Sequence, residues 1–209
     1  IGGEGGKVLK WKGKVGFITA CTPAIDQFTG KIGPLGERWV MYRYPVTDGY
    51  GETITSLRNT DPRAMREDLS LLVESFFEEI ELNWDGEEEK RLLTPQEEER
   101  LFALSSLVCA SRSPITRDKY TGEVTDLATR ESTPRIANEL AQMYLGLERI
   151  GLDEDERWRV VCKMAGDSTP QLKWKMIKQL KENGGKLSIK KVVDHVQCGT
   201  KIVRHTLID

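Results

Sequence analysis

The chain has few histidines and no grouped cysteines. Its 209 residues include two histidines, His195 and His205, and four cysteines, at positions 21, 109, 162 and 198. A closed zinc site needs four ligands at short paired spacings, and a disulfide framework needs a denser set of cysteines. We therefore predict no metal site and expect reduced thiols. With both histidines near the C-terminus, a Ser-His-Asp or Cys-His catalytic site is not credible either.

Long apolar runs are also lacking. No segment approaches the length that a membrane span requires, and no basic segment followed by an apolar core opens the chain as in a signal peptide. The composition, 38% hydrophobic and 31% charged residues, is typical of a folded globular protein. We expect a cytoplasmic protein without a membrane partner. The first residue, Ile1, followed by two glycines, suggests a piece of a longer polypeptide.

A complete phosphate-binding loop is missing as well. Residues 2–7 read GGEGGK. A Walker A loop needs G-x-x-x-x-G-K followed by Ser or Thr, between a strand and a helix. Here Lys7 is followed by Val8 and further strand-like residues, so no hydroxyl is placed to bind magnesium. The chain alone is not expected to hydrolyse ATP.

What the chain does have is a segregated charge. Residues 67–99 contain thirteen acidic side chains and two basic ones, whereas residues 167–209 contain nine basic and four acidic side chains, a local net charge of +5 (nine minus four). Such segregation favours a polyanion-binding C-terminal end. Two alternatives stay open: each stretch is simply a solvated helix face, or the basic end docks on an acidic partner, including the chain's own acidic stretch.

The N-terminal third, residues 1–60, is predicted to be rich in β-structure. Three runs carry the prediction: Lys7–Trp11, the apolar run Val15–Cys21, and Trp39–Tyr44. A short apolar run with β-branched residues is typical of a strand buried on both faces.

Residues 61–166 have the spacing of amphipathic helices. Helices are expected to begin at Asp61-Pro62, Thr94-Pro95, Thr133-Pro134 and Asp153, each with a capping residue and, in three cases, a proline at the first helical position. Residues 113–125 are expected to form a loop or hairpin. The fold class is therefore mainly α with a small β part: a sheet remnant, a helical bundle, then a small C-terminal module.

The C-terminal module spans residues 167–209. Helices are expected over 171–183, from a Ser188 cap to Val196, and from Thr200 onward, with Gly184-Gly185 and residues 197–199 as turns. The stretch KWKMIKQLKENGGKLSIKKVVDHVQCGTKIVRHTLID resembles the winged-helix family. Two short helices joined by a turn, the second one basic, match the helix-turn-helix arrangement.

That resemblance implies a DNA-binding surface on the last helix. It would expose Thr200, Lys201, Arg204 and His205 to the major groove, with Arg204 able to contact guanine, and would place Lys190 and Lys191 near phosphates. The strands of a wing would begin where the sequence stops, so the wing is expected to be truncated. Modules of this shape also dock proteins, and that alternative stays open.

Three further segments resemble the downstream half of AAA-type P-loop ATPases, especially the helicase-like proteins of mobile elements. GFITACTPAID resembles the sensor 1 strand, PLGERWVMYR the arginine-finger segment, and ATRESTPRIANEL the start of the lid helix with sensor 2. The resemblance implies roles for Thr22 (with Asp26 a weaker candidate), Arg38 and Arg135 in sensing the γ-phosphate. It also implies ATP, magnesium and a homo-oligomer for the full-length protein, whose Walker A and B motifs would lie outside this chain.

The sequence leaves two main functions open. The chain is the C-terminal, DNA-binding part of an oligomeric ATPase, inactive alone, or it is a non-enzymatic winged-helix regulator that binds DNA. A piece of an ATPase would continue upstream into a phosphate-binding loop, whereas a regulator would begin near Ile1.

Overall fold

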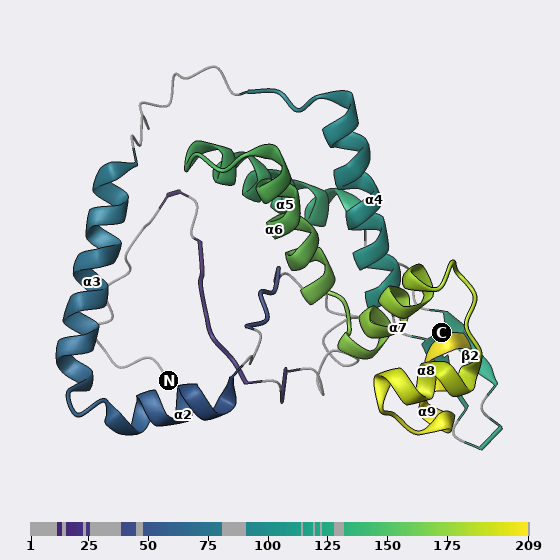
Figure 1. Ribbon diagram of the computed structural model, residues 1–209. Helices are drawn as coiled ribbons and strands as arrows, with labels where there is room; N and C mark the ends of the chain where they lie inside the picture. Colours follow the sequence, from purple (N-terminus) through teal and green to yellow (C-terminus); the bar gives the residue numbers. More distant parts are fainter. Residues whose placement is uncertain are drawn as a thin grey trace, which may run out of the picture.

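The protein is mainly helical. The computed structural model describes residues 12–13, 16–22, 24–25, 39–44, 48–80, 91–113, 115–118, 120–121, 123–127 and 132–208 (Figure 1). Its helices are α2 (Gly49–Arg58), α3 (Pro62–Glu79), α4 (Pro95–Arg112), α5 (Thr133–Arg149), α6 (Glu154–Asp167), α7 (Gln171–Glu182), α8 (Ile189–Val196) and α9 (Thr200–Ile208). The sheet of the described part is one antiparallel hairpin, β1 (Ile115–Arg117) and β2 (Val124–Leu127).

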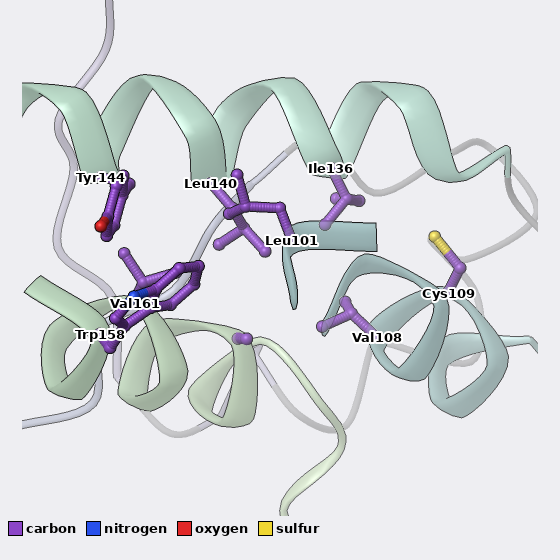
Figure 2. Packing of buried hydrophobic residues seen from close by; sticks show 9 residues of the cluster. Leu101, Val108, Cys109, Ile136, Leu140, Tyr144, Trp158 and Val161 are labelled. Carbon is purple, nitrogen blue, oxygen red and sulfur yellow. The ribbon is translucent and has the colours of Figure 1, made fainter. Parts of the chain in front are cut away.

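Helices α4, α5 and α6 form a bundle around the larger core. Leu101 and Val108 of α4, Leu140 of α5 and Val161 of α6 are buried in it. Figure 2 shows how these side chains meet between the helices. At one end Tyr144 lies against Trp158, with ring centroids 4.5 Å apart. The predicted helical spacing of residues 95–166 is thus confirmed.

Capping residues set where the bundle helices begin. Thr94 and Glu97 form a capping box at the start of α4, in which each side chain bonds the other residue's backbone N–H. Asp153 accepts a hydrogen bond from the backbone of Glu156 and caps α6. At α5 the cap position is Ser132, not the predicted Thr133, and its side chain makes no capping bond. The helix therefore begins one residue earlier than predicted, and Thr133 and Pro134 both lie in its first turn.

Helices α7, α8 and α9 surround a second, smaller core. Met176, Val192, Val196 and Val203 are buried together there. The glycines predicted to end α7 do so, because Gly184 and Gly185 have φ values of +65° and +80°, which favour glycine. Ser188 caps α8 as predicted. Ile189, the first residue of α8, is exposed.

The strands predicted for the N-terminal third are not found among its described residues. Residues 16–22 form no strand and are exposed, and residues 39–44 are irregular. The run Lys7–Trp11 lies outside the described residues. An apolar, β-branched run satisfies only the local requirement of a strand; a strand also needs a hydrogen-bonded neighbour, and none of the described strands pairs with these residues.

Instead of pairing in a sheet, residues 39–44 lie along the bundle. Met41 N donates to Ser168 Oγ at 2.8 Å, and Arg43 N donates to Asp167 Oδ2 at 2.7 Å. Lys163 Nζ donates to the Arg43 carbonyl at 2.8 Å and pairs with Asp167. The side chains at the end of α6 thus take the place that a neighbouring strand would have.

In the described ranges, α2 and α3 precede the bundle. The sequence did not indicate α2, which has glycines at positions 49 and 51; Asp48 caps it by accepting from Gly51 N. The Asp61 cap of α3 is confirmed, because its carboxylate accepts from the backbone of Arg63 and Ala64. Figure 1 shows α3 standing apart from α4–α6, and none of its residues is buried.

Candidate nucleic-acid interface

The last helix, α9, separates an apolar side from a cationic side. Val203 is fully buried, with 0% of its surface exposed, against α7 and α8. Thr200, Lys201 and Arg204 are exposed. Because residues at helical spacing share a face, burial of Val203 turns the other side of α9 outward. The side chain of the predicted site residue His205 lies outside the described part.

A tight reversal positions α9 against α8. Gln197 has φ +53° and ψ +40°, a left-handed conformation, and its N–H bonds the carbonyl of Val193 at 2.9 Å. Val203 N then bonds the Gly199 carbonyl at 3.1 Å, which continues α9 from its first turn. The predicted turn at 197–199 is confirmed. It joins two short helices that share one core.

Helix α8 presents two lysines in its first turn. Lys190 and Lys191 are both exposed. The first turn of a helix carries a partial positive charge, so cations there are unfavourable for the isolated helix. The same turn becomes favourable when an anion lies in front of it, because the free backbone N–H groups and both ammonium groups then act together.

The basic side chains of this module have no carboxylate partners within the described residues. No ion pair is found for the nine basic residues of 167–208, and Lys178 lies over the ring of Trp174 at 5.3 Å. Of the acids in this part of the chain, Glu182 accepts from Gln179, Asp167 binds the segment 39–44, and Asp194 is exposed on α8. The positive charge predicted from the sequence is therefore not neutralised within the described part of the module.

Of the predicted nucleotide-sensing residues, the structure describes Thr22 and Arg135. Thr22 is exposed, at the end of a segment that is not a strand. Arg38 and Asp26 lie outside the described residues. Arg135 is half-buried in the first turn of α5. Burial raises the pKa of the neighbouring Glu139, and the guanidinium of Arg135 opposes that rise. Arg135 thus interacts with the interior of the bundle.

A second cluster of charged side chains, in the bundle, was not singled out from the sequence. Arg91 pairs with Glu97 at 2.7 Å and with Glu148 at 3.0 Å, and Arg157 pairs with Glu148 at 2.8 Å. The hydrogen bond from Arg91 lowers the pKa of Glu97 to about 2. Burial, with the nearby Glu97 carboxylate, raises the pKa of Tyr144 to about 12.

This cluster has a structural role. Arg157 lies over the Tyr144 ring at 4.6 Å and pairs with the Glu148 carboxylate, so its charge is balanced, while its buried Nε and Nη1 have no well-oriented hydrogen-bond acceptor among the described residues. The capping signal Thr94-x-x-Glu97 was visible in the sequence, but its partner Arg91 follows the acidic stretch and carries no periodic signal. Each charged side chain of the cluster thus has a partner of opposite charge inside the bundle.

The described residues contain no group of three or more His, Cys, Asp or Glu side chains placed to hold a metal ion. None of the helices in the described ranges has the length and apolar character needed to cross a membrane. No family model matches the chain, and no curated protein or solved structure is similar to it. The geometry of the chain itself is therefore the basis for a functional assignment.

Proposed function

We propose that α7, α8 and α9 form a helix-turn-helix module of the winged-helix kind, and that it binds duplex DNA. In this proposal α9 is the recognition helix and enters the major groove, where an α-helix fits. Lys201 and Arg204 contact DNA from α9, and Lys190 and Lys191 contact phosphates from the first turn of α8.

One observation carries the proposal: α9 buries Val203 while its exposed cations, Lys201 and Arg204, have no acidic partner within the described residues. An arginine that served only to hold the fold would have a partner inside the chain, as Arg91 has in Glu97. An exposed arginine with no acidic partner in the described ranges can direct its guanidinium to two parallel hydrogen bonds with guanine or phosphate.

The two lysines of α8 support the same geometry. Lys190 and Lys191 lie where the partial positive charge of α8 is concentrated. A phosphate in front of this turn would remove an unfavourable interaction and add two favourable ones. Contacts of this kind give affinity without sequence information, whereas contacts from α9 to base edges would give specificity.

The test measures binding of the 209-residue chain to a fluorescent mixed-sequence duplex by anisotropy. With four to six phosphate contacts, affinity should fall by roughly 100-fold or more between 50 and 200 mM salt. Arg204→Ala should weaken binding by about 5- to 100-fold. The matched control is Arg159→Ala on α6, which removes another exposed arginine, 77% of whose side chain is accessible. Equal effects of the two substitutions, or binding that ignores salt, would overturn the proposal.

The parent protein stays a prediction. An oligomeric AAA-type ATPase, with ATP and magnesium bound by another part of the polypeptide, and a non-enzymatic regulator would both use the DNA-binding module proposed for residues 167–209. The encoding gene distinguishes them: a GKT or GKS loop and an acidic Walker B strand upstream of Ile1 would support the ATPase, and a start codon near Ile1 would support the regulator.

A further inference from the structure

The two cores of the molecule meet at a short junction between α6 and α7. The core of α4–α6 and the core of α7–α9 consist of different residues, and the chain crosses from one to the other through Ser168, Thr169 and Pro170. Trp174 of α7 packs so closely on Gly166 of α6 that an added Cβ at Gly166 would overlap its ring. Small interfaces between parts of one chain permit relative motion, so the orientation of the module depends on what else holds this junction.

Residues 39–44, here called the strap, bind the junction through hydrogen bonds. Met41 N donates to Ser168 Oγ at 2.8 Å. Arg43 N donates to Asp167 Oδ2 at 2.7 Å, and Arg43 Nε donates to the Asp167 carbonyl at 2.9 Å. The two backbone donors are two residues apart, which is the spacing at which one edge of an extended segment repeats. The strap thus presents one edge to the end of α6.

Arg112 of α4 joins the strap to the junction a second time. Its side chain is buried, and its guanidinium donates to the Ser168 carbonyl at 2.7 Å and to the Trp39 carbonyl at 2.8 Å. A guanidinium is planar and directs its N–H groups along fixed directions, so one group holds both carbonyls in place. The strap, the residue after α6 and the end of α4 therefore form one hydrogen-bonded unit.

The strap is held mainly by polar contacts. Trp39, Tyr42 and Tyr44 are 45%, 57% and 75% exposed, and none of the six side chains of the strap is fully buried. Val40 packs against the bundle core but is only half-buried. Segments with few buried apolar contacts open locally while the cores beside them stay folded. The strap is therefore the part of this unit that can separate first.

We propose that residues 39–44 are a releasable strap that fixes the α7–α9 module in one orientation on the bundle. While the strap is bound, the module and the bundle move as one body. When the strap separates, the module turns about residues 168–170 and both cores stay intact. The strap thus couples the N-terminal part of the chain to the direction in which α9 faces. This inference stands whether or not α9 binds DNA.

The main test compares the rotational correlation times of α4–α6 and α7–α9 by nuclear magnetic resonance relaxation of the backbone amides in the whole chain. The release variant combines Met41→Pro with Arg43→Pro and removes both backbone donors, because proline has no N–H. The wild type should give one correlation time for both parts. In the release variant, the correlation time of the module should become shorter than that of the bundle by about a quarter or more.

The matched control combines Tyr42→Pro with Tyr44→Pro. It places two prolines in the same segment, at residues whose N–H groups make no hydrogen bond in the described ranges. The control should keep the single correlation time of the wild type. Independent motion of the module in the wild type, no change in the release variant, or equal changes in the two variants would overturn the proposal.

A second measurement needs no substitution. If the strap separates by itself, the amides of Met41 and Arg43 should exchange with deuterium at least about tenfold faster than the amide of Val161 in the bundle core. Exchange of all three amides at one rate would mean that the strap opens only when the bundle unfolds, and it would contradict a releasable strap.

Discussion

Arginines in the α4–α6 bundle and basic residues in the α7–α9 module differ in what they contact. Arg112 is 6% exposed, and its guanidinium donates to the carbonyls of Ser168 at 2.7 Å and Trp39 at 2.8 Å. Arg91 and Arg157 pair with carboxylates around Tyr144. Arg204 in α9 is exposed and has no carboxylate partner among the described residues.

The difference shows how the internal contacts of a basic side chain indicate whether it serves the fold or is available for binding. Neither the amino-acid composition nor the net charge distinguishes the arginines of the bundle from Arg204. A cation whose partners lie inside the chain stabilises the fold, whereas one without internal partners is available to another molecule. The comparison predicts that substitutions in the bundle change stability, and that substitutions on α9 change binding.

The largest effect should come from Arg112. Replacing it by Met leaves the carbonyls of Ser168 and Trp39 without their buried donor and should lower the free energy of unfolding by about 2–4 kcal/mol. The measurement is urea denaturation followed by circular dichroism. The comparison variant, Arg204→Met, should change the unfolding free energy by less than about 0.5 kcal/mol, since it removes an exposed, unpaired side chain. Equal losses of unfolding free energy for Arg112→Met and Arg204→Met would contradict the difference between bundle and module.

Acid should weaken the bundle through Glu97. Its pKa is lowered to about 2 in the folded chain, against an ordinary value of 4.5, because Arg91 stabilises the carboxylate. A depressed pKa gives stability that is complete above about pH 4.5 and is lost as the pH falls toward 2, here about 3 kcal/mol.

Glu97→Gln tests this contribution, because glutamine also fits the capping box with Thr94. The variant should be less stable than the wild type at pH 7, and the difference in unfolding free energy should shrink as the pH approaches 2. A difference that stays constant with pH would show that the ion pair with Arg91 is not its source.

A smaller effect, of opposite sign, is expected in the turn before α9. Gln197 has a left-handed backbone, with φ +53°, which costs a residue with a side chain more than it costs glycine. Gln197→Gly should therefore stabilise the chain by about 0.5–1 kcal/mol. Thermal unfolding measures the gain. Destabilisation by this substitution would mean that the Gln197 side chain contributes to the module through a contact that the backbone argument ignores.

The sequence predicted the helices better than the strands, for a physical reason. The caps Asp61, Thr94, Asp153 and Ser188 act within three residues of themselves, so a local pattern is sufficient to find them. Strand formation depends on a distant partner. The apolar run over 15–21 and the segment 39–44 have the local composition of strands, but the described residues of both form none.

For the candidate sites, the sequence indicated which basic residues are exposed, but it did not indicate which side chains contact one another. Lys201, Arg204, Lys190 and Lys191 were singled out through the resemblance to the winged-helix family, and all four are exposed. The half-buried position of Arg135, the pairing of Arg91 with Glu97 and the uncovered face of α3 depend on how helices pack. No local pattern contains that information, because it arises from contacts between segments far apart in the chain.

The most direct test of the account is a nuclear magnetic resonance titration of the 209-residue chain with a short duplex. Amide signals of α8 and α9 and the Nε–H signal of Arg204 should shift at low salt, while signals of α4–α6, including Tyr144 and Trp158, should stay in place. Shifts confined to the bundle, or an Arg204 signal that does not move while the duplex binds, would contradict the claim that the unpaired cations of α9 meet DNA.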